Sequence, residues 1–398
     1  MTKLFLSANK IYEGPGNIIF MINEQYLYRE LQLHLDKLPI GYPATESGVE
    51  IELLKYFFNT EEAKAALSLG LTIAPMWRIR RRYKKKFGGG ISAGDLRSIL
   101  DRLYMKGCIR RGDKSPYGYA NAFLALGMFE YHVDDLTPEL MEILHRYYDE
   151  GFMNEFFRTL LSQLRTSPHM KAIVPEHRID TYDNMREYVK NTKEIIGVAN
   201  CVCKQGEAIL GEKCKVVGDD IEICIFFGKG NYLDRNRGRN ITKDECLLLL
   251  DKAEDKGLVI QPGNSQQVFC ICLCCGCCCG VLTSAKKFEK PAELFATNYY
   301  AVINNEKCTG CGLCIKRCQM DAITRIDKQN VNLNRDRCIG CGLCVTKCSK
   351  KAVTLKRKDK KTKPPRNIEL LYLTILMRRA GKKKMIVNLL KLMFGMPL

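Results

Sequence analysis

Eight cysteines in the C-terminal part of the chain have the spacing of metal ligands. They follow the pattern CxxCxxCxxxC twice, thirty residues apart: Cys308, Cys311, Cys314 and Cys318, then Cys338, Cys341, Cys344 and Cys348. Glycines between the ligands allow a tight loop whose N–H groups point at bound sulfur. Thiolates are soft ligands that favour zinc or iron–sulfur clusters. Two triplets that are each followed by a single cysteine favour an iron–sulfur site, because zinc sites use separated CxxC pairs.

The repeat resembles bacterial ferredoxins with two [4Fe–4S] clusters. CTGCGLC matches CIGCGLC, and the likeness covers residues 299–355. In these ferredoxins the fourth cysteine of each run binds the other cluster. The resemblance therefore implies two sets of ligands: Cys308, Cys311, Cys314 and Cys348 for one cluster, and Cys338, Cys341, Cys344 and Cys318 for the other. It also implies one-electron transfer, and folding that is coupled to metal binding.

One feature departs from the resemblance. These ferredoxins have proline after the fourth cysteine, whereas Gln319 and Ser349 occupy those positions here. Without proline a backbone N–H is added near each sulfur, which alters the cluster potential in a direction that we do not predict.

A second field of cysteines precedes these motifs. Its seven candidate ligands are Cys201, Cys203, Cys214, Cys224, Cys272, Cys274 and Cys275. The first four are enough for a third [4Fe–4S] cluster or a zinc ion, and we favour the cluster. The run CICLCCGCCCG at 270–280 supplies alternative ligands or a distinct cluster, while some of its thiols serve as small buried hydrophobes. Cys277, Cys278 and Cys279 cannot all face one ion on an extended backbone.

The order of the two cysteine fields resembles a group of poorly characterised 4Fe–4S dicluster proteins of anaerobes. These proteins begin with a winged-helix-like region. The resemblance implies architecture and cofactors but no particular reaction.

The positions of the cysteines also indicate the cellular compartment in which the protein is expected. Twenty of the 21 cysteines lie from Cys201 onward, in arrangements too tight for convenient disulfides. Residues 1–10 do not form a signal peptide, and no run of about 18 apolar residues could span a bilayer. We expect a reducing, cytoplasmic location with metal-bound thiolates.

The formal net charge of +19 indicates an anionic partner. Basic residues concentrate at 78–86 (RIRRRYKKK) and 356–363 (KRKDKKTK). Nucleic acid, anionic lipid and acidic proteins all fit such charge, and bound clusters offset part of it because they are themselves negative.

The elements that must position these ligands are predicted from periodicity and caps. Helices are expected at 25–34, 48–58, 63–71 and 92–106, followed by hairpin strands at 108–111 and 120–129. This order resembles a winged helix, and we favour docking over DNA binding for it. Further helices are expected from Thr137 to Leu164, at 243–256 after the cap Thr242, and at 368–379 and 385–394, where peripheral membrane contact is one alternative.

The fold class predicted is α+β, because helices and strands are segregated along the chain. We divide it into a winged-helix-like domain (1–135), a helical linker region (136–195), a cysteine-rich putative-cluster domain (196–298), a two-[4Fe–4S] ferredoxin domain (299–356) and a basic helical tail (357–398).

The function predicted is electron transfer to a partner oxidoreductase. No P-loop, no GxGxxG after a strand and no nucleophile–base set is recognisable, so we favour an electron-transfer component over a stand-alone enzyme. Two alternatives stay open. One is a redox-sensing DNA-binding regulator, and the other is an oxidoreductase with its reaction centre between Cys201 and Cys279.

Overall fold

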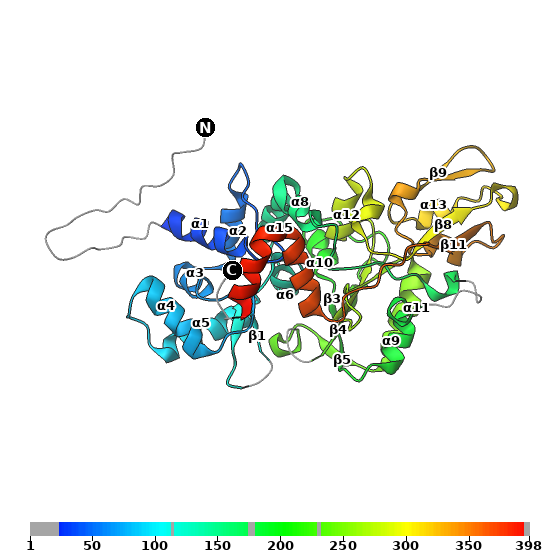
Figure 1. The fold of residues 1–398 in the computed structure, drawn as a ribbon. Helices are drawn as coiled ribbons and strands as arrows, with labels where there is room; N and C mark the ends of the chain where they lie inside the picture. Colours follow the sequence, from blue (N-terminus) through cyan, green and yellow to red (C-terminus); the bar gives the residue numbers. More distant parts are fainter. Residues whose placement is uncertain (1–23, 113–114, 174–179, 229–231, 394–398) are drawn as a thin grey trace.

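A computed structural model describes residues 24–112, 115–173, 180–228 and 232–393 (Figure 1). The N-terminal helices lie at one end of the molecule, the ferredoxin-like domain lies at the other, and a β-sheet lies between them. Residues 1–10, for which we expected no signal peptide, fall outside the described residues.

The N-terminal region consists of helices and one hairpin. The helices are α1 (Glu24–Leu35), α2 (Val49–Phe57), α3 (Thr60–Ala66), α4 (Met76–Phe87) and α5 (Ala93–Lys106), and the hairpin pairs β1 (Ile109–Arg111) with β2 (Tyr119–Asn121). A helix followed by a hairpin therefore occurs where predicted, and Ala74 adds a bridge to Tyr119. The second strand is shorter than expected, because the backbone turns at Leu126, whose φ is 53°.

The next segment is helical but ends earlier than predicted. It comprises η1 (Leu124–Met128), α6 (Phe129–Tyr131), α7 (Pro138–Tyr147), η2 (Tyr148–Phe152) and α8 (Met153–Phe157). Thr137 caps α7 by accepting the N–H of Leu140 at 3.1 Å. The helix expected to reach Leu164 stops at Phe157, before Leu160 adopts a positive φ of 50°. Two short 3-10 turns follow, η3 (Met170–Ala172) and η4 (Thr181–Asp183).

The central sheet has five antiparallel strands. Their order is β5 (Arg239–Ile241), β3 (Ile196–Asn200), β4 (Glu222–Phe227), β7 (Cys270–Cys274) and β6 (Val259–Pro262). Helices α9 (Met185–Asn191) and α11 (Lys243–Lys256) cover one face, where Leu250 packs with Ile225 and Ile271. Side chains alternate along a strand, so Cys272 and Cys274 lie on the opposite face, which packs toward the N-terminal helices.

Short helices and turns surround the sheet. They are α10 (Val202–Ile209), η5 (Leu233–Arg235), α12 (Gly280–Lys286) and η6 (Pro291–Leu294). The predicted helix α11 begins after its cap, where Thr242 accepts the N–H of Glu245 at 3.1 Å, and ends at Gly257 with a φ of 91°.

The ferredoxin-like domain repeats one unit twice. Its elements are β8 (Tyr299–Ile303), η7 (Asn305–Lys307), α13 (Leu313–Arg317), β9 (Ile323–Arg325), β10 (Val331–Leu333), η8 (Arg335–Arg337), α14 (Leu343–Thr346) and β11 (Val353–Arg357). Strand β8 pairs with β11, and β9 pairs with β10. Because the first strand pairs with the last, the two ends of the domain lie side by side.

The tail returns across the whole molecule. After β11 the chain runs past the sheet to α15 (Ile368–Met393), which lies beside the N-terminal helices (Figure 1). Leu371 and Ile375 are buried in the same core as those helices, and the hydroxyl of Tyr372 donates to Gln163 at 2.7 Å. The two predicted tail helices form one element that is interrupted at Gly381. Among the described residues, no helix is long and apolar enough to cross a bilayer.

Candidate metal centres

The ferredoxin-like loops depend on glycine. Gly310 and Gly340 have φ values of 67° and 69°, in the left-handed region that side chains rarely adopt. A Cβ at Gly310 would overlap the carbonyl oxygen of Lys328, and one at Gly340 would overlap that of Tyr299. The loops can therefore close around a bound group only with glycine at these positions.

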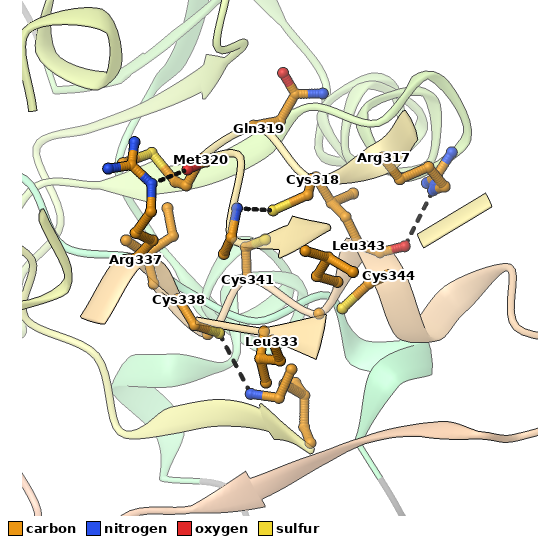
Figure 2. Close-up of a pocket in the computed structure, with 17 residues that line it drawn as sticks. Arg317, Cys318, Gln319, Met320, Leu333, Arg337, Cys338, Cys341, Leu343 and Cys344 are labelled. Atoms are coloured by element: carbon orange, nitrogen blue, oxygen red, sulfur yellow. Dashed lines mark hydrogen bonds between the residues drawn. The ribbon is translucent and has the colours of Figure 1, made fainter. Parts of the chain in front are cut away.

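Four cysteines line one cavity in this domain. Figure 2 shows Cys318, Cys338, Cys341 and Cys344 around it, together with apolar side chains such as Leu333. Cys318 comes from the first motif and the other three come from the second. The structure thus brings together the four residues that the ferredoxin resemblance implies for one cluster.

Backbone donors point at the sulfurs of this cavity. The Sγ atom of Cys318 accepts the N–H of Ala322 at 3.2 Å, and that of Cys338 accepts the N–H of Ala301 at 3.4 Å. Burial raises the pKa of Cys341 to about 12, and the sulfurs of Cys318 and Cys338 add to the shift. A bound metal ion would deprotonate such a thiol, so this donor set fits a cation.

The second ligand set is nearer the surface. Cys311 is exposed, and the Sγ atom of Cys308 accepts the N–H of Gly310 at 3.4 Å. Burial raises the pKa of Cys314, and the sulfurs of Cys308 and Cys311 contribute. Cys348 is partly buried in the same small core as Cys308 and Cys314, and its place in this ligand set stays a prediction.

Gln319 links the ferredoxin-like domain to the second cysteine field. Its side-chain Oε1 accepts the N–H of Gly276 at 2.7 Å, and a Cβ at Gly276 would overlap the backbone oxygen of Gln319. Nearby, Arg317 donates to Leu343 at 3.0 Å and to the carbonyl of Asp255, at the end of α11, at 3.1 Å. Gln319, which stands where the resembling ferredoxins have proline, thus has a structural role, because its side chain binds the cysteine run at 270–280.

In the second field the structure brings together a group that we call the four-thiol site. Cys214 and Cys275 were candidates, and they join Cys277 and Cys278, with all four sulfurs within 4.8 Å of one another. The prediction missed Cys277 and Cys278 because it treated the run as extended. Residues 276–278 instead form a turn, which lets two adjacent thiols face one point. The glycine inside the run was the available signal for that turn.

The other five candidates lie in a separate group, with Cys224, Cys272 and Cys274 on strands of the sheet and Cys201 and Cys203 at the start of α10. With Cys279 they form a chain of neighbouring thiols, which we call the sheet-face thiols: Cys201, Cys203, Cys279, Cys274, Cys272 and Cys224, in that order. Cys224 and Cys272 face each other across β4 and β7. Donation from Cys203 and Cys274 lowers the pKa of Cys279 to about 5. Cys279 therefore faces a different group from Cys277 and Cys278.

Lys204 lies between the two groups. It is 1% exposed, and its Nζ donates to the Sγ of Cys275 at 3.0 Å. Burial opposes its charge, but the sulfurs of Cys201, Cys275 and Cys274 outweigh burial and raise the pKa of Lys204 above its ordinary value. No carboxylate in the described part of the chain pairs with this buried ammonium, which fits thiols that are held as thiolates.

The domain contains two cysteine loops that turn at glycine residues, and cysteines from both loops line one cavity. These features define a 4Fe–4S ferredoxin-like domain. Residues 301–355 match the family model described as a 4Fe-4S dicluster domain. The match begins within β8 and ends within β11, so it spans the paired halves of this domain. No curated protein and no solved structure matches the chain.

Proposed function

We propose that this protein transfers single electrons to a partner oxidoreductase and holds two [4Fe–4S] clusters in its ferredoxin-like domain. The observation that carries the proposal is the cavity that Cys318 shares with Cys338, Cys341 and Cys344. The clusters supply one-electron chemistry when bound. The chain's residues hold the ligands in apolar surroundings and direct N–H groups at their sulfurs.

The two ligand sets differ in access to solvent, which supports a direction for the transfer. Cys311 is exposed, whereas all four cysteines around the cavity are only partly exposed. We propose that the partner docks over Cys311, because electron transfer needs the shortest path to the surface.

We propose a third [4Fe–4S] cluster at the sheet-face thiols. Cys224 and Cys272 are surrounded by protein but are still partly accessible to solvent. The same holds for Cys341 beside its cavity. Gln261 pairs with Cys272 in the sheet register, is fully buried, and its amide has no hydrogen-bond partner among the described residues. Cluster sulfur would accept from such a donor.

Metal analysis of the anaerobically purified protein tests the two-cluster proposal. We expect at least about eight iron atoms and eight sulfide ions per chain, with EPR signals that appear on reduction. Cys318→Ser should weaken one ferredoxin cluster signal, while Cys246→Ser, a buried thiol on α11 outside both groups, should not. About four irons or fewer in wild type would contradict the proposal, because a single cluster supplies that number.

The third cluster has its own test. Wild type should then contain about twelve cluster irons, and Cys272→Ser should lower the count by about four while the ferredoxin EPR signals remain. An unchanged count in Cys272→Ser, relative to Cys246→Ser, would leave the third cluster without support but would not affect the other two.

A further inference from the structure

We propose that the four-thiol site binds a single tetrahedral metal ion, zinc or iron, and not a cluster. Cys214, Cys275, Cys277 and Cys278 are its ligands. The site is additional to the clusters of the proposed function, and its argument does not depend on them.

The distances between the sulfurs carry this proposal. Sγ–Sγ distances are 3.4 Å for Cys275 and Cys277, 3.5 Å for Cys277 and Cys278, and 3.8 Å for Cys214 and Cys275. Cys214 and Cys277 are 4.0 Å apart. A regular tetrahedron with metal–sulfur bonds of about 2.3 Å has edges of about 3.8 Å. The four sulfurs therefore already have the spacing that one ion requires.

The size of a cluster argues against it here. Each ligand of a four-iron cluster binds a different iron, so the cluster itself separates the sulfurs. Cys214, Cys275 and Cys278 are only 4%, 0% and 3% exposed, so little free space adjoins them. Of the four ligands only Cys277 is partly exposed. The packing at the four-thiol site suits one ion.

The surroundings complete a closed site. Four thiolates and a divalent ion carry a net charge of about −2, and the buried ammonium of Lys204 donates to Cys275 at 3.0 Å. The backbone N–H of Lys215 donates to Cys277. Donors of this kind orient ligands and tune a metal site. With four protein ligands and no open position, the site has the make-up of a structural one.

The position of the site indicates what the ion would hold. Cys214 comes from the loop after α10, and the other three ligands come from the turn between β7 and α12. Gly276, in that turn, donates to Gln319 of the ferredoxin-like domain. The ion would therefore fix the loop on which that domain docks.

Metal analysis and X-ray absorption on the full-length, anaerobically purified protein test the proposal. We expect about one zinc, or about one iron in excess of the sulfide count, per chain. If the metal is zinc, absorption at the zinc edge should show about four sulfur neighbours at about 2.3 Å and no metal neighbour. If it is iron, the excess of iron over sulfide is the readout, because the iron edge also reports the clusters. Which element is found distinguishes zinc from iron. Absence of both a zinc and an excess iron would overturn the proposal.

Variants separate this site from the clusters, because a single ion contains no sulfide. Cys277→Ser and Cys214→Ser should each lose about one metal ion per chain without loss of sulfide. Cys246→Ser should lose neither. Loss of about four irons together with about four sulfides in both site variants would show a cluster there, and the single-ion proposal would be wrong. Should either variant fail to fold, the zinc, iron and sulfide counts of the wild-type protein decide alone.

Discussion

The side chain of His34 makes the stability of the folded protein depend on pH. The Nε2 of His34 lies 3.1 Å from the carbonyl oxygen of Leu69. Burial lowers the pKa of His34 to about 4, and Lys37 and Lys86 contribute to the shift. The folded protein thus keeps the ring neutral at a pH where the unfolded chain binds a proton. His34 therefore reduces stability as pH falls from about 6.5 toward 4.

We expect His34→Gln to remove this part of the pH dependence. Between pH 7 and pH 5 the wild type should lose about 2 kcal/mol more unfolding free energy than the variant, from a pKa difference of about 2.5 units. Urea unfolding at the two pH values, with a probe in the N-terminal helices, measures the difference. Equal losses in the two proteins would show that His34 is not responsible.

Spacing alone could propose the ferredoxin-like ligands, because each set is mostly local in sequence. Cys338, Cys341 and Cys344 lie within seven residues of one another, and only Cys318 is brought in by the fold. The four-thiol site could not be predicted in the same way. Its ligand Cys214 lies more than sixty residues from Cys275, and its membership depends on the turn at 276–278.

At the scale of elements, predictions were best where caps and periodicity agree. Helix α11 has a cap at Thr242, a terminating Gly257 and an apolar side, and its bounds were as expected. Helix α4 was missed although its apolar residues Met76, Ile79, Tyr83 and Phe87 recur at helical spacing and pack against the core. The run of basic residues between them was interpreted only as charge, so the period was overlooked.

The contact between two elements gives a second prediction, at Gln319. Gln319→Pro would restore the residue of the resembling ferredoxins but would remove the acceptor for Gly276 N–H. Loss of this hydrogen bond costs about 1 kcal/mol, so exchange of the Gly276 amide should become roughly fivefold faster. Hydrogen exchange followed by mass spectrometry on a peptide that spans 275–279 measures the change.

A matched variant controls this experiment. Gln319→Glu keeps an oxygen acceptor at the same place, so its exchange should stay close to that of wild type. If Gln319→Pro were equally protected, the docking contact would not depend on this side chain.

At the scale of the whole molecule, metal content should divide the fold into parts that need it and parts that do not. The ferredoxin-like domain has a small core to which its own cysteines contribute, including Cys314 and Cys338. The face of the sheet under α9 and α11 has a mainly aliphatic core around Leu250 and Ile271, and thiols of the four-thiol site form only a part of it. Metal binding therefore stabilises the fold of the ferredoxin-like domain far more than the fold of the sheet.

We expect removal of iron by a chelator and an oxidant to unfold residues 299–357 first. In hydrogen exchange that segment should lose protection, while α11 keeps most of it. Protein reconstituted with iron and sulfide serves as the control and should regain protection. Simultaneous loss of protection in both segments would mean that the chain unfolds as a single cooperative unit.

The positive charge of the molecule also acts at this scale. Arg81, Lys84 and Lys85 are exposed on α4, at the opposite end of the molecule from the ferredoxin-like domain. Charge of this kind attracts an anionic partner and makes association faster at low salt. One end of the molecule thus carries an exposed basic helix, and the other end carries the ferredoxin-like domain.

The returning tail sets an order of events during synthesis. Tyr372 of α15 packs against Phe123, with ring centroids 4.4 Å apart, so a segment translated late completes the core of the N-terminal helices. At about 5–20 residues per second, the N-terminal helices leave the ribosome roughly 15–60 s before α15. The sheet-face thiols are complete well before the tail arrives, which leaves an interval for metal delivery. A chain that ends at Asn367 should therefore still bind metal but melt at a lower temperature.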